Sequence, residues 1–196
     1  MRQAAFRLCV YCGSRTGAAP AHAEAARTVG RLVGERGWGL VYGGGRIGLM
    51  GLMADGALAA GAAVLGVIPR DLRAREVGHD GLTELRVTDT MHQRKQAMAE
   101  AADAFLALPG GIGTFEELFE VWTWRQLGHH DQPIGLLNVG GYYDALLGFM
   151  RRTVAEGFVS EDTLAMVEVG DDPAELLTRL HARAASASGR DDYSRT

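Results

Sequence analysis

The chain has 196 residues, of which 47% are apolar and 22% charged, and its formal net charge is −4. This length and apolar content suit one α/β domain that buries a substantial core. The acidic balance argues against a nucleic-acid binder, because neutralising phosphates requires a basic face, and it favours a small-molecule partner.

The N-terminal segment MRQAAFRLCVYCGS lacks the apolar segment and the cleavage site of a signal peptide. No apolar run reaches the roughly 18 residues that a membrane span needs, so we expect a cytoplasmic protein with no membrane partner. Cys9 and Cys12 have the C-x-x-C spacing, but residues three apart on a strand point to opposite faces. We therefore expect buried strand cysteines in preference to a redox motif or half of a zinc site.

Short apolar runs alternate with longer segments of helical period, which is typical of a parallel sheet with helices on both faces. The expected strands are Leu8–Cys12, Leu40–Tyr42, Ala63–Ile68, Glu84–Val87, Ala104–Leu108, Ile134–Leu137 and Met166–Val169. The expected helices are Ala21–Arg36, Leu49–Ala60, Met91–Ala102, Thr114–Leu127, Tyr142–Glu156 and Pro173–Arg183. We predict a doubly wound, Rossmann-like α/β domain over residues 1–183. A disordered tail follows at 184–196, because its polar residues bury too little apolar surface.

Three expected strands end in glycine-containing loops, at Cys12–Ser14, Gly43–Gly51 and Pro109–Thr114. In open α/β sheets ligands bind outside the carboxyl ends of the strands, where N–H groups at helix N-termini attract phosphate. Glycine lets the backbone approach such an anion closely. Tight turns alone would explain any single loop, but two long loops of this kind in one small domain favour a phosphate site.

The second loop matches the dinucleotide fingerprint G-x-G-x-x-G at Gly43, Gly45 and Gly48. That fingerprint also needs an acidic residue after the following strand to hold the ribose, whereas here Pro69 and Arg70 stand at that place. NAD binding is therefore weakly supported, and Arg70 leaves open an NADP 2′-phosphate. The sequence contains no G-x-x-x-x-G-K-[ST] run, which argues against a P-loop nucleotidase.

The helix expected from Thr114 has an apolar arc with Glu117 on its margin, while Glu116, Glu120 and Thr123 point away from it. The arc is formed by Phe115, Leu118, Val121, Trp122 and Trp124. A carboxylate at the edge of such an arc is partly desolvated and suited to chemistry. A capping box, Thr114-x-x-Glu117, explains the same glutamate equally well, and the two interpretations stay open. We expect Glu116 to be a solvated acid of the first turn.

On the helix expected at Met91–Ala102, Arg94 lies inside the apolar stripe and Lys95 at its edge. A guanidinium directed toward the core needs an anion, either a structural carboxylate or a ligand's phosphate or carboxylate. Lys95 is the only lysine, so any Schiff base would have to form there. His92 is expected to be a surface residue, and His129, His130 and Asp131 lack the further spacing that a metal site needs.

The motifs MHQRK at Met91–Lys95 and PGGIGTFEE at Pro109–Glu117 closely resemble the LOG family, whose members are cytokinin riboside 5′-monophosphate phosphoribohydrolases once mislabelled lysine decarboxylases. The likeness extends from Val10–Ser14 through Val41–Gly51 to Gln126–Asp144. It implies hydrolysis of the N-glycosidic bond of an adenine-type nucleoside 5′-monophosphate, giving free base and ribose 5-phosphate, without a cofactor or metal. It also implies a homodimer, for which the Trp122–Trp124 region would offer apolar surface.

The family's catalytic arginine and glutamate fall on Arg94 and Glu117. The implied substrate contacts are Gly44, Gly45, Glu76, Lys95, Gly110, Gly111, Ile112, Gly113, Thr114, Phe115, Glu116 and Thr123. Cleaving an N-glycoside builds positive charge on the sugar, which a carboxylate such as Glu117 stabilises. Whether Arg94 serves the phosphate or the departing base stays open.

Two other functions compete with hydrolysis. The first is a non-catalytic protein that binds or senses AMP-like nucleotides on the same fold. The second is a molybdenum-cofactor carrier, which uses a similar architecture but need not possess the paired Arg94 and Glu117. A lysine decarboxylase is disfavoured, because Lys95 would have to carry the cofactor alone.

Overall fold

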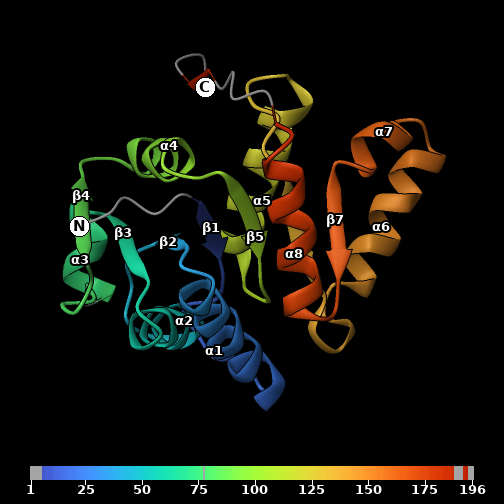
Figure 1. Cartoon of the computed structure of the whole chain (residues 1–196). Coiled ribbons are helices and arrows are strands. Elements are labelled where there is room, and N and C mark those ends of the chain that lie inside the picture. The colour runs from blue at the N-terminus through green and yellow to red at the C-terminus, as the bar shows by residue number, and fades with distance from the viewer. Residues whose placement is uncertain (1–5, 77, 188–191, 194–196) are drawn as a thin grey trace.

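The computed structural model describes residues 6–76, 78–187 and 192–193. A single sheet of seven strands runs in the order β4-β3-β2-β1-β5-β6-β7, and every neighbouring pair is parallel (Figure 1). The strands are β1 (Arg7–Tyr11), β2 (Gly39–Tyr42), β3 (Ala63–Pro69), β4 (Glu84–Thr88), β5 (Ala104–Ala107), β6 (Ile134–Leu137) and β7 (Val167–Gly170). The expected doubly wound α/β class is confirmed.

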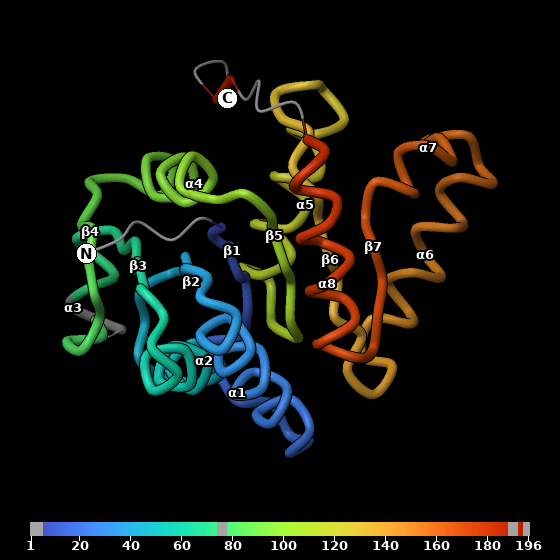
Figure 2. The backbone as a smooth tube through the Cα atoms, in the orientation of Figure 1, coloured from blue at the N-terminus to red at the C-terminus, as the bar shows by residue number. Residues whose placement is uncertain are grey.

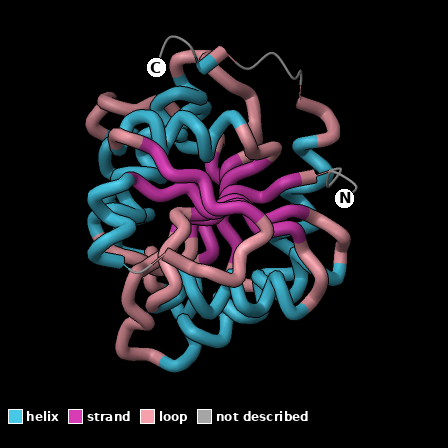
Figure 3. The backbone as a smooth tube through the Cα atoms, turned by 90° about the vertical axis from the view of Figure 1, so that its left-hand side faces the viewer, coloured by secondary structure: helices cyan, strands magenta, loops and turns pink. Residues whose placement is uncertain are grey.

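Helices cover both faces of the twisted sheet (Figure 3). They are α1 (Pro20–Glu35), α2 (Gly48–Ala59), α3 (Arg70–Glu76), α4 (Met91–Glu100), α5 (Ile112–Gln126), α6 (Asp144–Ala155), α7 (Glu161–Leu164) and α8 (Pro173–Ala184), with a 3-10 turn at Val139–Gly141. Helices α1, α2 and α8 share one apolar core with the sheet, and α4, α5 and α6 share the other. In Figure 2, α3 lies at the β4 edge, and α6 and α7 lie beyond β7.

Successive side chains of each strand point to opposite faces of the sheet and so build two apolar cores. On β1, Leu8 and Val10 face the α1 side, whereas Cys9 and Tyr11 face the α5 side. Cys12 continues the alternation into the first core, so the two cysteines are buried on opposite faces and both are free thiols. The predicted buried strand cysteines are confirmed, and burial raises the pKa of each thiol.

The direction in which strands are added reverses between β1 and β5. Strands β2, β3 and β4 extend the sheet to one side of β1, and β5, β6 and β7 extend it to the other. The loops that leave the carboxyl ends of β1 and β5 therefore diverge, which opens a crevice at the edge where ligands bind in such folds. The glycines at Gly13 and Gly110 stand at this crevice, whereas the Gly43 loop follows β2 beside it.

The expected boundaries differ from the observed ones by one or two residues at most element ends. Helix α5 begins at Ile112, two residues before the expected start, and this shift changes the roles of Thr114 and Glu116. The short helices α3 and α7 were not expected, because they are too short to show a hydrophobic period. No helix in the described ranges is long and apolar enough to cross a membrane.

The expected disordered tail, 184–196, falls partly on residues 188–191 and 194–196, which lie outside the described residues. Within it, α8 continues to Ala184, and Tyr193 is buried with 6% of its surface exposed. The Tyr193 ring contacts the rings of Trp124 and His130, and its hydroxyl donates to the Gln132 side chain. The polar composition of the tail did not indicate that this aromatic residue packs against the domain.

Candidate functional site

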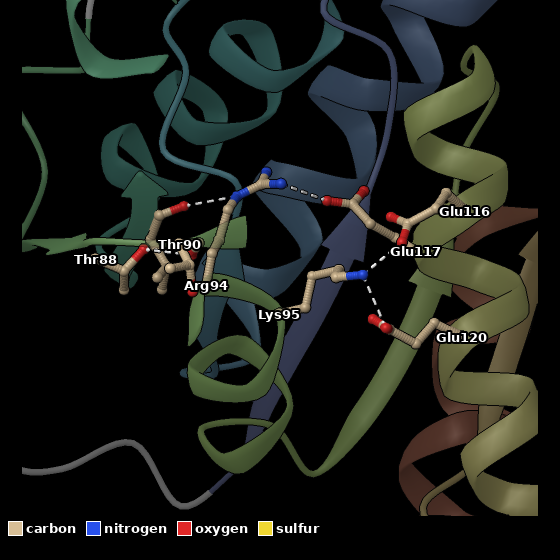
Figure 4. A network of polar contacts seen from close by, with 8 residues as sticks. Thr88, Thr90, Arg94, Lys95, Glu116, Glu117 and Glu120 are labelled. Carbon is tan, nitrogen blue, oxygen red and sulfur yellow. Dashed lines mark hydrogen bonds and ion pairs between the residues drawn. The ribbon is translucent and has the colours of Figure 1, made fainter. Parts of the chain in front are cut away.

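An arginine on α4 and a glutamate on α5 meet above the sheet. Arg94 Nη1 lies 2.9 Å from Glu117 Oε1, and only 8% of the surface of each residue is exposed (Figure 4). Arg94 Nε also donates to the Val67 carbonyl near the end of β3, at 3.1 Å. Both residues that the sequence marked as catalytic are therefore brought together, and the anion that Arg94 requires includes this carboxylate.

The local sequence explains how Arg94 reaches this position. The Thr90 hydroxyl accepts from the Gln93 N–H and so caps the start of α4. Arg94 and Met98, one helical turn apart, then share the buried face of the helix. The predicted placement of Arg94 within the apolar stripe is confirmed, whereas Met91 at the first position is exposed.

Burial changes the acidity of Glu117. Desolvation raises the pKa of its carboxyl to about 7, and the charge of Arg94 opposes that rise. The capping box is wrong: the N-cap of α5 is Gly111, so Thr114 already lies inside the helix and Glu117 pairs with Arg94 across the site. Of the two interpretations of Glu117, the partly desolvated carboxylate is the one that the geometry bears out.

Lys95 bridges α4 to α5 beside this pair. Its Nζ contacts the Glu116 carboxylate and donates to Glu120 Oε1 at 2.8 Å, as Figure 4 shows. Burial alone would lower the pKa of Lys95, but the two carboxylates raise it above the ordinary value. The expected exposure of Glu116 is confirmed, but its expected place in the first turn is wrong, because the early start of α5 moves it out of that turn, where it pairs with Lys95.

The loops after β1, β2 and β5 interlock through their backbones. Gly13 N–H donates to the Pro109 carbonyl at 3.1 Å, and Leu49 N–H donates to the Gly13 carbonyl at 3.0 Å. A Cβ on Gly110 would lie 2.1 Å from Thr114 Oγ1 and 2.9 Å from the Gly13 nitrogen. Only a glycine at 110 lets these segments approach so closely.

The helices that begin at these loops leave their first N–H groups unused by side chains. Within the described part of the chain, no side-chain hydrogen bond caps α1, α2 or α5, and none of the three has an acidic residue in its first turn. By contrast, Thr90, Ser160 and Asp172 cap α4, α7 and α8. Uncapped N-termini present donors and a positive dipole end, which together suit an anion.

A cavity of about 580 Å³ opens between the β1 and β5 loops, at the crevice where the strand order reverses. Its walls include Ser14, Arg15, His22, Gly111 and Tyr142. The Tyr142 ring packs edge-on against His22, with centroids 5.5 Å apart. The cavity reaches the uncapped start of α5 at Gly111, and Glu117 lies further along that helix, outside the residues that line the cavity.

Sequence reasoning missed two tyrosines that hold the third glycine loop. The Tyr142 hydroxyl donates to the Gly110 carbonyl at 2.5 Å, and the Tyr143 hydroxyl donates to the Leu108 carbonyl at 2.6 Å. Both follow β6, far from the loop in sequence. The adjacent tyrosines belong to the stretch that carried the family resemblance, but their pattern alone did not indicate a contact with Gly110.

Three other predicted substrate contacts, Gly44, Gly45 and Glu76, lie in or near the segments around α3. Gly44 and Gly45 join the segment after α3, because Gly45 pairs with Gly78 and the Gly44 carbonyl accepts from His79 N–H. Glu76 ends α3, and its side chain lies outside what the structure describes.

Along α5 the remaining predicted contacts fall on different faces. Ile112 and Gly113 are exposed at the helix start, and Phe115 packs against Tyr143. Thr123 is exposed, and its hydroxyl donates to the Phe119 carbonyl of its own helix at 2.7 Å. Nothing in these contacts places Thr123 at the Arg94–Glu117 pair.

The histidines weighed as metal ligands and the arginine weighed as an NADP contact lie apart from the Arg94–Glu117 pair in the contacts that follow. His92 is exposed, and His130 is buried with Nε2 2.8 Å from the Val121 carbonyl. Residues 6–76, 78–187 and 192–193 contain no group of three or more histidines, cysteines or acids arranged to hold a metal ion. Arg70 pairs with Asp89 at 3.1 Å on the surface.

The family model described as "Possible lysine decarboxylase" matches residues 50–180. The chain is 49% identical over 174 residues to a cytokinin riboside 5′-monophosphate phosphoribohydrolase of Oryza sativa subsp. japonica, covering 89% of this chain and 72% of that protein. It is also 49% identical over 174 residues to such an enzyme of Arabidopsis thaliana, covering 89% of this chain and 80% of that protein.

Solved structures share the architecture at lower identity. A Moco carrier protein from Chlamydomonas reinhardtii superposes with a TM-score of 0.70 at 20% identity, covering 94% of this chain and 99% of that one. The molybdenum cofactor binding protein of Rippkaea orientalis gives a TM-score of 0.67 at 21% identity, with 93% and 98% covered. At such identities the likeness shows the fold alone.

Proposed function

Because the chain belongs to the LOG family of cytokinin riboside 5′-monophosphate phosphoribohydrolases, we propose that it hydrolyses the N-glycosidic bond of N6-modified AMP, and of AMP itself. The products are the free base and ribose 5-phosphate. The observation that carries the proposal is the buried Arg94–Glu117 pair, whose glutamate lies on α5, the helix whose uncapped N-terminus borders the cavity.

The substrate phosphate binds at the start of α5. Gly111 lines the cavity, and Glu117 lies six residues further along the same helix, about 9 Å at the α-helical rise. In a nucleoside 5′-monophosphate the ribose separates the phosphate from C1′, so one substrate can extend from the helix start toward Glu117. A phosphate on the N–H groups of Gly111–Thr114 would therefore leave the sugar within reach of the Glu117 carboxylate, so that remote binding energy positions the reacting carbon.

Glu117 acts on the sugar. As the bond between C1′ and the base nitrogen breaks, its electron pair leaves with the base and positive charge develops on the ribose. The ionised Glu117 carboxylate stabilises that charge and accepts a proton from the water whose oxygen bonds to C1′. The departing base takes up a proton, which completes the hydrolysis. A pKa near 7 suits a carboxyl that must release and accept a proton at neutral pH.

Arg94 works beside Glu117 rather than at the phosphate. Its Nε and Nη1 are engaged by the Val67 carbonyl and by Glu117, so the guanidinium is held at the reacting end of the site. There its charge keeps part of the Glu117 population ionised. The positive charge of the guanidinium also stabilises the negative charge that develops on the departing base.

Lysine decarboxylation, which the label of the matching family model names, fits this site poorly. The amine of a pyridoxal phosphate lysine is nucleophilic only when it loses its proton, which a lowered pKa favours. Here the carboxylates of Glu116 and Glu120 raise the pKa of Lys95 and occupy its amine. The only lysine of the chain is thus held charged.

The test is a side-by-side turnover of isopentenyladenosine monophosphate, AMP and the two ribosides, with Glu117→Gln as the control. We expect free base from the monophosphates, much less from the ribosides, and none from the variant. Release of no base from any substrate would refute hydrolysis. If calorimetry then showed AMP bound equally by the parent and by Glu117→Gln, the nucleotide-binding or sensor function would be favoured.

The protein is further proposed to act in the cytoplasm as a homodimer. Trp122 and Trp124 are buried in the core on the α5 side of the sheet, so their own side chains offer little of the apolar surface that the sequence suggested. Exposed apolar side chains lie instead at Ile112, Leu127 and Phe149. An isologous dimer is the commonest form of homo-oligomer, and light scattering with size exclusion tests for it.

A further inference from the structure

The first glycine after β2 lies directly against the Arg94 guanidinium. A Cβ built on Gly43 would lie 2.2 Å from Arg94 Nη2 and 3.4 Å from Arg94 Cζ. We propose that Gly43 is a positioning residue of the active site: its missing side chain is the space that lets the Arg94 guanidinium reach Glu117. The inference rests on the proposed function for its kinetic consequences, but its structural part is independent of it.

Arg94 is fixed on three sides, each from a different element. Nε donates to the Val67 carbonyl of β3, Nη1 pairs with Glu117 of α5, and Nη2 faces the Gly43 backbone. A guanidinium is planar and rigid, so its nitrogens cannot move independently. Any atom placed at the Gly43 Cβ position must therefore shift the whole group and lengthen at least one of the other two contacts.

The backbone of Gly43 does not itself require glycine. Its φ angle lies outside the left-handed region, which the neighbouring Gly44 occupies at φ 78°. Apart from Arg94, the nearest atom to the built Cβ is Met50 Sδ at 3.4 Å, an ordinary contact. By contrast, a Cβ on Gly48 would lie 2.3 Å from the backbone carbon of Ser14. Alanine at 43 would thus collide with the Arg94 side chain alone, whereas alanine at 48 would collide with the backbone.

The first experiment compares Gly43→Ala with Gly148→Ala on the full chain. Gly148 is the matched control, since it lies in α6 and its built Cβ comes only within 3.9 Å of an Arg151 nitrogen. We expect Gly43→Ala to keep the parent's thermal midpoint but to lose about tenfold to a hundredfold in kcat/KM, the scale of a 1 Å misplacement. We expect Gly148→Ala to keep full activity.

A double-mutant cycle separates positioning from a general disturbance of the loop. If Gly43 acts only through Arg94, adding Gly43→Ala to Arg94→Met should lower kcat/KM no further, because no guanidinium remains to be displaced. Gly43→Ala should also move the acid limb of the pH profile upward, as Arg94→Met does, since both separate Glu117 from its cation. Additive losses with an unmoved acid limb would overturn the inference.

A measurement that needs no activity keeps the two proposals distinguishable. The Arg94 Nε–H, hydrogen-bonded to the Val67 carbonyl, gives an NMR resonance that can be assigned by its loss in Arg94→Met. We expect that resonance to shift or vanish in Gly43→Ala and to persist in Gly148→Ala. If it were unchanged in Gly43→Ala, the positioning role would be refuted, whatever the turnover. If the resonance changed in Gly43→Ala but the parent released no base, hydrolysis alone would be refuted.

Discussion

Arg94 and Glu117 form an ion pair at 2.9 Å although each is more than nine-tenths buried, and the pKa of Glu117 still lies near 7. Desolvation therefore outweighs the neighbouring charge at this carboxyl. A buried pair of this kind is poor evidence of stability, because desolvation offsets much of the attraction. Its chemical consequence is a carboxyl that changes its charge in the physiological range.

The first prediction concerns the pH profile of hydrolysis. If ionised Glu117 is the working form, kcat/KM should rise with pH and level off above an apparent pKa near 7. In Arg94→Met the residual activity should have its acid limb shifted upward by about one pH unit or more, because the opposing charge is gone. Initial rates across pH 5 to 9, roughly the range of physiological titration, provide the measurement. A flat profile would contradict the role of Glu117.

The second prediction concerns stability and the same carboxyl. The folded-state pKa of Glu117 exceeds the ordinary 4.5, so the folded chain holds a proton that the unfolded chain releases. Its contribution to stability is full below pH 4.5 and is lost as pH rises through about 7. Urea unfolding at several pH values should show this decline in the parent and not in Glu117→Gln. Identical slopes in the two proteins would contradict it.

The third prediction concerns His130, which should change stability with pH in the opposite direction to Glu117. Burial lowers the pKa of its imidazole to about 4 from 6.5, so the unfolded chain binds a proton that the folded chain excludes. Stability should therefore rise with pH between about 4 and 6.5, and His130→Gln should flatten that part of the curve. The same unfolding series measures it, and a variant that kept the parent's slope would speak against the assignment.

The fourth prediction uses the two adjacent tyrosines as a matched pair. Tyr143→Phe removes the donor to the buried Leu108 carbonyl, which should cost about 1–3 kcal/mol in the free energy of unfolding. Tyr142→Phe removes the donor to Gly110 at an exposed position, so it should cost little stability and mainly raise KM by loosening the phosphate site. Equal effects of the two variants on KM and on stability would refute this division of roles.

The fifth prediction concerns the C-terminal segment. Tyr193 is buried against Trp124 and His130, so Tyr193→Ala should lower the free energy of unfolding by about 3 kcal/mol. Its partner Gln132 precedes β6, at the end of the sheet opposite the glycine loops. Turnover at a temperature where the variant stays folded should therefore match the parent. A variant as stable as the parent would show that this packing is dispensable.

Much of the fold was predictable because it rests on local patterns. The alternation on β1 placed Cys9 and Cys12 on opposite faces, and the structure confirms both positions. The helical period placed Arg94 toward the core, which is also confirmed. The start of α5 was harder to predict, because its N-cap is Gly111, which has no capping side chain for a sequence pattern to show. That difference of two residues was enough to make the capping box wrong.

The sequence by itself determined the succession of the seven strands and the six longer helices, the glycine loops at the strand ends, and the need of Arg94 for an anion, since these follow from period, composition and desolvation. Only the tertiary structure decided which anion it meets, which tyrosines hold the third loop, and which glycine makes room for the guanidinium. These contacts join residues that are far apart in the chain. They come together only because the helices and loops pack on the sheet, and such packing leaves no local pattern in the sequence.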